Sequence, residues 1–351
     1  MKRNLKIKKV LGFTLALGMS MAVMTGCSSE TSTEDSANDT SESESASTDE
    51  AATNDTTDSI DYPTQPIQVI VPAGAGGDTD QNARMFAKFM EEELGQPLVI
   101  VNMGGGGGII GMDSVRSSNP DGYTSLFFHV ENMIPKITGL ADYDYHDFEI
   151  AGIGLVDNTT VIATHKDSPY TTMEELQAYA LDNPGEVEFG MQVGGYSHIL
   201  GLALEDELGV EFNHVDIGGN SAKTTALVAR QTDVINTQYG LTKDYFDTGE
   251  FIALGLTSPE RNQLIPDVLT TTEQGFPLDF NKFFYFAFPE GTPAEVVDKF
   301  STALENVTNN SDFIAEAESK FLTPVFMDSE TSIAYMDEVF EGLMEYQSLL
   351  D

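Results

Sequence analysis

From Ile67 to Asp80 the chain runs IQVIVPAGAGGDTD, a β-branched strand pattern followed by a glycine loop and the start of a helical pattern. A second loop, the five glycines Gly104–Gly108, follows the apolar run Leu98–Val101 and also opens into a helical pattern. Such loops expose backbone N–H groups and direct the positive end of a helix dipole toward whatever binds there. The pair of loops therefore predicts half of a pocket for an anionic group.

Strand and helix patterns alternate along the rest of the chain. Strands are expected at 67–71, 98–101, 124–128, 150–155, 160–164, 186–190, 212–216, 233–238, 252–257 and 283–288. Helices are expected at 83–94, capped at Asp78 or Thr79 and stopped at Gly95, and at 109–116, 172–182, 197–208, 219–230, 293–307 and 331–350. Single helices between strands predict an α/β protein with parallel sheets and ligand sites at the carboxyl ends of the strands.

Two further loops lie in the middle of the chain, at Gly190–His198 and Asp216–Ala222. Each follows a strand pattern and opens a helical one, as the first two loops do. Residues 62–351 also exceed the usual length of a single core, so two domains are expected. Four junctions in two separated groups predict two lobes that face one cleft.

The N-terminus has the composition of a secretory signal. Residues 1–26 carry five basic residues and no acidic ones, followed by the apolar run Val10–Met24, which is short for a membrane-spanning helix. The sequence Met24-Thr25-Gly26-Cys27 resembles a bacterial lipobox, so Cys27 is expected to be lipidated and to anchor the mature chain. The alternative is a thiol placed there by chance. Because Cys27 is the only cysteine, no disulfide is expected.

An acidic segment separates this anchor from the folded part. Residues 28–61 hold eleven acidic residues and no basic one, a composition typical of a disordered tether, although it could also bind a basic partner. Residues 62–351 hold 46 acidic and 12 basic residues, a net charge of −34. Nucleic acid and anionic lipid would both be repelled by such a body.

Five short motifs follow one another along residues 62–351. They are Tyr62-Pro63-Thr64-Gln65-Pro66-Ile67, the first glycine loop through Ala83-Arg84, Leu94-Gly95-Gln96-Pro97 with Asn102–Gly111, Asn119-Pro120-Asp121-Gly122-Tyr123-Thr124, and Pro289-x-Gly291-Thr292-Pro293. Together they resemble the substrate-binding proteins of tripartite tricarboxylate transporters, the Bug or TctC type of periplasmic receptor. The resemblance covers the whole chain after the tether.

The resemblance implies a two-lobed, Venus-flytrap fold of the type II periplasmic-binding-protein kind, with the ligand cleft between the lobes. Lobe one would comprise 62–156 and 286–351, lobe two would comprise 157–285, and crossover strands near Val161 and Phe286 would form the hinge. Such proteins bind small di- or tricarboxylates and deliver them to a membrane permease. The chain is therefore expected to be a non-catalytic, monomeric receptor, lipid-anchored on the extracytoplasmic face of a Gram-positive-type cell.

The predicted ligand contacts come from the four glycine loops and from one later strand end. They are Ala73, Gly74, Gly76, Gly77, Asp78, Thr79, Gly105, Gly106, Gly107, Met191, Gly194, Gly195, Tyr196, Ser197, His198, Asn220, Asn236 and Gln238. Competing interpretations remain for several of them. The glycines could be tight turns, His198 could bond to its own loop, and Tyr196 could pack at the hinge. No cofactor or metal is expected, because the histidines lack metal-ligand spacing.

The loops depart from the family pattern in a way that bears on the ligand. The family usually has proline where Gly74 and Ala75 stand, and Arg-Pro where Met103 and Gly104 stand. No basic residue lies inside the four loops, and Lys223 only follows the fourth. Backbone N–H groups, hydroxyls and water are therefore expected to hold the carboxylate, and salt should affect binding only modestly. A ligand that is neutral or cationic stays possible.

Two other functions compete with that of a receptor. A nucleotide- or phosphate-ester-binding protein could use the same loops, but the chain lacks the Gly-Lys-Ser/Thr of a P-loop, and Gly74-x-Gly76-Gly77 is only a loose dinucleotide fingerprint. An exported hydrolase would need a nucleophile, and neither a Gly-x-Ser-x-Gly motif nor a cysteine occurs after the tether. The receptor is the favoured interpretation.

Overall fold

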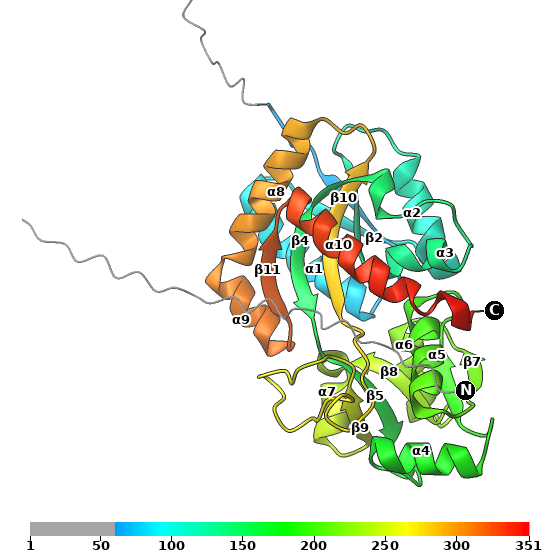
Figure 1. The fold of residues 1–351 in the computed structure, drawn as a ribbon. Coiled ribbons are helices and arrows are strands. Elements are labelled where there is room, and N and C mark those ends of the chain that lie inside the picture. The colour runs from blue at the N-terminus through cyan, green and yellow to red at the C-terminus, as the bar shows by residue number, and fades with distance from the viewer. Residues whose placement is uncertain (1–59, 351) are drawn as a thin grey trace, which may run out of the picture. The chain divides into compact units, whose positions relative to one another are not determined.

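The computed structural model describes residues 60–350, in which the strands form two separate sheets (Figure 1). We call the six-stranded sheet and its helices lobe one, and the five-stranded sheet and its helices lobe two. The order in lobe one is β11-β4-β10-β3-β1-β2, with β1 (Ile67–Val71), β2 (Leu98–Asn102), β3 (Thr124–His129), β4 (Phe148–Asp157), β10 (Lys282–Pro289) and β11 (Thr323–Met327). The order in lobe two is β7-β6-β8-β5-β9, with β5 (Thr160–His165), β6 (Glu188–Met191), β7 (Asn213–Asp216), β8 (Val234–Gln238) and β9 (Phe251–Leu256).

Helices connect the strands in both lobes. Lobe one has α1 (Asp78–Leu94), α2 (Ile109–Arg116), α3 (Ile134–Ile137), α8 (Ala294–Thr308), α9 (Ser311–Ser319) and α10 (Ser329–Met344), with short 3-10 turns η1 (Gly106–Gly108), η2 (Val130–Met133), η3 (Tyr145–Asp147) and η4 (Gln347–Leu349). Lobe two has α4 (Met173–Asp182), α5 (Tyr196–Leu208), α6 (Asn220–Val228) and α7 (Tyr239–Asp247). Both lobes lie within one compact unit. The expected α/β fold with two lobes is confirmed.

The sheet of lobe one is buried on both faces, and β10 shows how. Its even-numbered phenylalanines pack into one cluster with helices α1 and α8. The ring of Phe286, for example, has its centroid 5.5 Å from that of Phe86 in α1 and 5.1 Å from that of Phe300 in α8. The alternate residue Tyr285 packs into a second cluster that includes Met112 of α2. Successive side chains of a strand point to opposite faces, and each buried phenylalanine contributes about 1.5–3 kcal/mol. This double burial explains why every residue of β10 is apolar after the first.

Helix α1 begins differently from the expectation. Its N-terminal cap is Gly77, which makes no side-chain cap hydrogen bond, so the predicted capping by Asp78 or Thr79 is wrong. The carboxylate of Asp78 instead turns toward Lys282. The end of the helix is as predicted: Gly95 adopts a left-handed conformation, and its N–H bonds to a carbonyl one turn earlier.

The sheets are mixed rather than parallel, which corrects the prediction. Strand β10 runs antiparallel to both β3 and β4, and β5 runs antiparallel to both β8 and β9. The pairs of β1 with β2 and β3, and of β6 with β7 and β8, are parallel as expected. The predictions also missed β11, α3, α7 and α9 and extended the last helix beyond Met344. The other predicted elements agree to within a few residues.

The chain crosses between the lobes twice, once between β4 and β5 and once between β9 and β10. The second crossing was expected near Phe286, but β10 already pairs with β4 from Lys282 onward. Residues 282–285 therefore belong to the sheet of lobe one, and we place the second crossing before Lys282. The ring of Phe280, at this crossing, contacts Tyr196 of lobe two and Tyr346 after α10, with centroids 5.5 and 5.3 Å away.

The signal segment, Cys27 and most of the tether lie outside the described residues. Among the helices of residues 60–350, none has the length and hydropathy needed to cross a bilayer.

Candidate ligand-binding cleft

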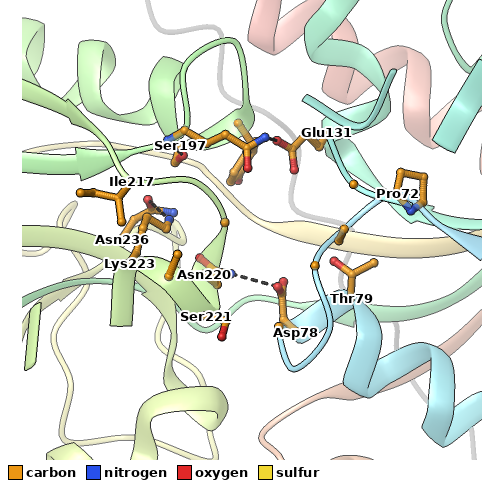
Figure 2. A pocket seen from close by; sticks show the side chains of 18 of the residues that line it. Pro72, Asp78, Thr79, Glu131, Ser197, Ile217, Asn220, Ser221, Lys223 and Asn236 are labelled. Carbon is orange, nitrogen blue, oxygen red and sulfur yellow. Dashed lines mark hydrogen bonds between the residues drawn. The ribbon is translucent and has the colours of Figure 1, made fainter. Parts of the chain in front are cut away.

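A cavity of about 510 Å³ lies between the two lobes (Figure 2). It opens where the carboxyl ends of β1, β3, β6 and β8 and the starting residue of β10 come together. Ten of the predicted contact residues line it: Ala73, Gly74, Gly77, Asp78, Thr79, Gly105, Tyr196, Ser197, Asn220 and Asn236. Both groups of glycine loops therefore face one space, from opposite lobes.

The other eight predicted residues do not line this cavity; they are Gly76, Gly106, Gly107, Met191, Gly194, Gly195, His198 and Gln238. Met191 is buried in the hydrophobic core. His198 accepts a hydrogen bond at Nδ1 from the N–H of Gly194, at 3.4 Å, so it bonds to its own loop. Gln238 bonds to Asn220 and to Thr160 beneath the cavity floor. The side chains of Met191, His198 and Gln238 therefore pack or form hydrogen bonds within lobe two and do not line the cavity.

The second glycine loop adopts a backbone conformation that depends on glycine. Gly105 to Gly108 all have positive φ, a backbone conformation that residues other than glycine rarely adopt. A Cβ on Gly107 would lie 2.9 Å from the carbonyl oxygen of Gly194 in lobe two. The missing side chain at Gly107 therefore allows the two lobes to approach closely at the cleft.

This close approach gives a first prediction. Substituting Gly107→Ala should weaken ligand binding about tenfold, because the added methyl group would hold the lobes apart at Gly194, and it should cost about 1 kcal/mol of stability. Gly139→Ala is the matched control, since Gly139 also has positive φ but has no atom within 4 Å of its ideal Cβ. Calorimetric titration and thermal unfolding separate the two effects. Equal affinities for the two variants would contradict the proposed contact.

A buried ion pair lies at the floor of the cavity. The Nζ of Lys282 is 2.8 Å from Oδ2 of Asp78, and both side chains are almost fully buried. Asn220 of lobe two donates a hydrogen bond of 3.0 Å from Nδ2 to Oδ1 of the same carboxylate. Burial acts to raise the pKa of Asp78, but the charge of Lys282 and the hydrogen bonds outweigh it and hold the pKa well below the ordinary value. The pair joins the start of α1 to the start of β10 and reaches across to lobe two.

Lys223 is a buried cation of a different kind. It lies on α6 with 2% of its surface exposed, and its Nζ donates a hydrogen bond of 2.7 Å to Oδ1 of Asn236. No carboxylate of residues 60–350 lies within ion-pair distance of it. Burial, reinforced by the charge of Lys282, lowers the pKa of Lys223 to about 7. An anionic ligand in the cavity would supply the counter-charge that Lys223 lacks.

Glu131 faces the cavity from lobe one, in the turn η2 after β3. Its Oε1 accepts a hydrogen bond of 3.0 Å from Nε2 of Gln192 in lobe two. Its other oxygen lies 3.6 Å from Nε2 of His129, whose pKa burial holds well below the ordinary value, so the imidazole is neutral. Burial also raises the pKa of Glu131. Within residues 60–350, this carboxylate therefore has amide and imidazole neighbours but no lysine or arginine within ion-pair distance.

The expectation of a site without basic residues is wrong, because Lys223 and Lys282 both line the cavity. His129, Glu131 and Gln192 were also missed as lining residues. One signal was available for Glu131, since it lies three residues after the predicted strand at 124–128. No group of three or more metal-ligating side chains occurs in the described part of the chain.

Comparison with known proteins gives the family. Residues 82–341 match the tripartite tricarboxylate transporter family receptor, TctC. This chain belongs to the TctC receptor family. It is 32% identical to a UPF0065 protein of Agrobacterium vitis, over 81% of this chain and 83% of the relative. It is 28% identical to protein BugT of Bordetella pertussis, over 79% of this chain and 87% of BugT.

Solved TctC-type structures share the fold. The periplasmic binding protein BugD superimposes with a TM-score of 0.77 at 27% identity, covering 82% of this chain and 98% of BugD. The MatC protein of Rhodopseudomonas palustris, solved with malate, gives a TM-score of 0.75 at 23% identity, covering 83% of this chain and all of MatC. The periplasmic-binding-protein-like fold and the family resemblance expected from the motifs are thus confirmed.

Proposed function

We propose that this chain is a non-catalytic, extracytoplasmic receptor that binds a small organic acid by its carboxylate and delivers it to a tripartite tricarboxylate permease. One observation carries the proposal: Lys223 is a buried lysine that lines the cavity, and no carboxylate of residues 60–350 lies within ion-pair distance of it. Burying an unpaired charge is unfavourable, so such a group is retained where a ligand supplies the opposite charge. Family membership supports the same function.

The backbone around Lys223 supports an anion at the same place. Helix α6 begins at Asn220, so the N–H groups of residues 220–222 have no carbonyl one turn earlier within the helix. Asn220, Ser221 and Ala222 all line the cavity, and Lys223 follows within the first turn. The helix dipole and the ammonium group therefore favour a carboxylate at one position.

The expected location completes the proposal. We propose that residues 1–26 are removed, that Cys27 carries lipid and that the acidic tether lets a monomeric receptor reach its permease from the membrane surface. The basic and apolar run, the lipobox-like sequence and the eleven acids of the tether support this arrangement. Incorporation of labelled palmitate in the native chain, and its loss with Cys27→Ser, would test the anchor.

A ligand screen tests the function. The protein without its tether is purified and the bound small molecules are identified by mass spectrometry; melting temperatures are then measured with carboxylates, amino acids, nucleotides and phosphate esters. Malate and adipate are included because structures of this fold have been solved with each. We expect stabilisation by small carboxylates, with modest salt dependence because buried charges are weakly screened. Stabilisation by nucleotides alone would rule the proposal out.

A further inference from the structure

We propose that the ligand is an amino monocarboxylate, whose carboxylate binds at Lys223 and whose ammonium group binds at Glu131. This inference rests on the proposed function and narrows its ligand class. Figure 2 shows the two residues on opposite sides of the cavity, Glu131 from lobe one and Lys223 from lobe two. A ligand that spans the cavity would meet both.

The first step is to find where a ligand anion can be placed. Three long helices begin at the cavity, namely α1, α5 and α6. The start of α1 already carries its own carboxylate, Asp78, which is paired with Lys282. The start of α5 faces Glu131, since a Cβ on its cap Gly195 would meet Oε1 of Glu131. At the start of α6, Asn220 donates a hydrogen bond to Asp78, but no carboxylate of residues 60–350 lies within ion-pair distance of Lys223. The cavity thus offers one anion position.

The second step concerns the opposite end of the cavity. Glu131 is mostly buried, and its oxygens contact the amide of Gln192 and the neutral imidazole of His129, while the backbone N–H of Tyr196 also favours its charged form. No lysine or arginine of residues 60–350 lies within ion-pair distance of it. A second ligand carboxylate here would meet a like charge in a poorly solvated space, which is unfavourable. An ammonium group would find the acceptor that it needs.

The summed charge of the lining leads to the same ligand. The ionisable lining groups are Asp78, Glu131, Lys223 and Lys282, with His129 neutral. Below pH 7, where Lys223 is protonated, and with both acids ionised, the lining has no net charge. A bound zwitterion leaves the cavity without net charge. A bound dicarboxylate adds two negative charges, which is more than the partial positive charge of one helix N-terminus can offset.

The test compares ligands that differ only in one end group. Dissociation constants are measured by calorimetry for succinate and 4-aminobutanoate, and for adipate and 6-aminohexanoate, with α-amino acids of similar size as a third set. We expect the native protein to bind an amino monocarboxylate at least tenfold more tightly than its matched dicarboxylate. In Glu131→Gln, the amino ligand should bind about tenfold more weakly and the dicarboxylate as well as before or better, since the like charge is gone.

Two further variants show that the effect belongs to the carboxylate of Glu131. Gly195→Ala keeps the acid but places a methyl group against its oxygen, so it should also reduce the preference for the amine. Glu91→Gln removes an exposed acid near the far end of α1 and should change nothing. If dicarboxylates bind the native protein more tightly and Glu131→Gln leaves their affinity unchanged, the inference is overturned while the receptor function stands. If neither ligand class binds, both fail.

Discussion

Replacing Lys223 with methionine is expected to weaken carboxylate binding about 100-fold without destabilising the unliganded protein. A charged hydrogen bond to a buried carboxylate is worth about 2–5 kcal/mol when one partner is truncated, and 100-fold corresponds to about 2.7 kcal/mol. In the free protein, the variant loses the bond to Asn236 but also loses a desolvated charge. These terms oppose each other, so the melting temperature should stay within about 3 °C of the native value.

The matched control is Lys166→Met, which removes an exposed lysine that follows β5. It should bind the ligand with native affinity. Calorimetric titration of the three proteins gives the affinities, and thermal unfolding without ligand gives their stabilities. A Lys223→Met protein that binds within threefold of native would show that the cavity holds its ligand without this cation.

The same proteins should differ in pH dependence. The pKa of Lys223 is about 7 in the folded protein and near 10.5 in an unfolded chain, so the unfolded state binds more protons between these values. This group alone therefore makes stability rise with pH from 7 to 10.5. Ligand binding has the opposite dependence, because only the charged lysine attracts a carboxylate. Affinity should be level below pH 7 and fall by up to tenfold per unit above it, whereas Lys223→Met should show no such fall.

The sequence predicted the parts of this site that follow strand ends. Asp78 and Asn220 end the loops that follow a strand pattern, and Asn236 lies in the second half of another. Parallel strands bring their carboxyl ends to one edge of a sheet. Lys282 could not be found in this way, because it is the first residue of its strand. An all-parallel sheet would place that residue at the edge away from the ligand. Strand β10 is antiparallel, which brings its start to the cavity.

The direction of β10 was itself hidden in the sequence. The strand reads KFFYFAFP, and all its residues are buried because helices cover both faces of the sheet. A continuous apolar run is typical of a strand in a parallel sheet, where both faces are usually covered. Here long connections bring the chain back from lobe two, so the direction depends on the path through the other lobe. The hydrophobic pattern within the strand carries no information about the path of the chain through the other lobe.

Breaking the buried pair at the cavity floor should have the largest effect on stability. In Asp78→Asn, the ammonium of Lys282 stays buried without its counter-charge, and removing one partner of a buried pair costs about 3–5 kcal/mol. The melting temperature should fall by about 5–10 °C. The pKa of Asp78 lies below its unfolded value, so its contribution is present above about pH 4 and is lost as the pH falls further. The native protein should therefore lose more stability on acidification than the variant does.

A double-mutant cycle separates the pair from its surroundings. Lys282→Met alone should be as damaging as Asp78→Asn, because it leaves the carboxylate without its cation, and the double variant should recover most of the loss. Lys88→Met is the exposed control, since it breaks only the surface pair with Glu316, which has the same 2.8 Å length, and it should cost less than about 1 kcal/mol. Losses that simply add in the double variant would show that the two charges do not stabilise each other. Recovery would mean that the pair contributes little net stability, and that its cost is tolerated because it fixes the starts of α1 and β10 beside the ligand.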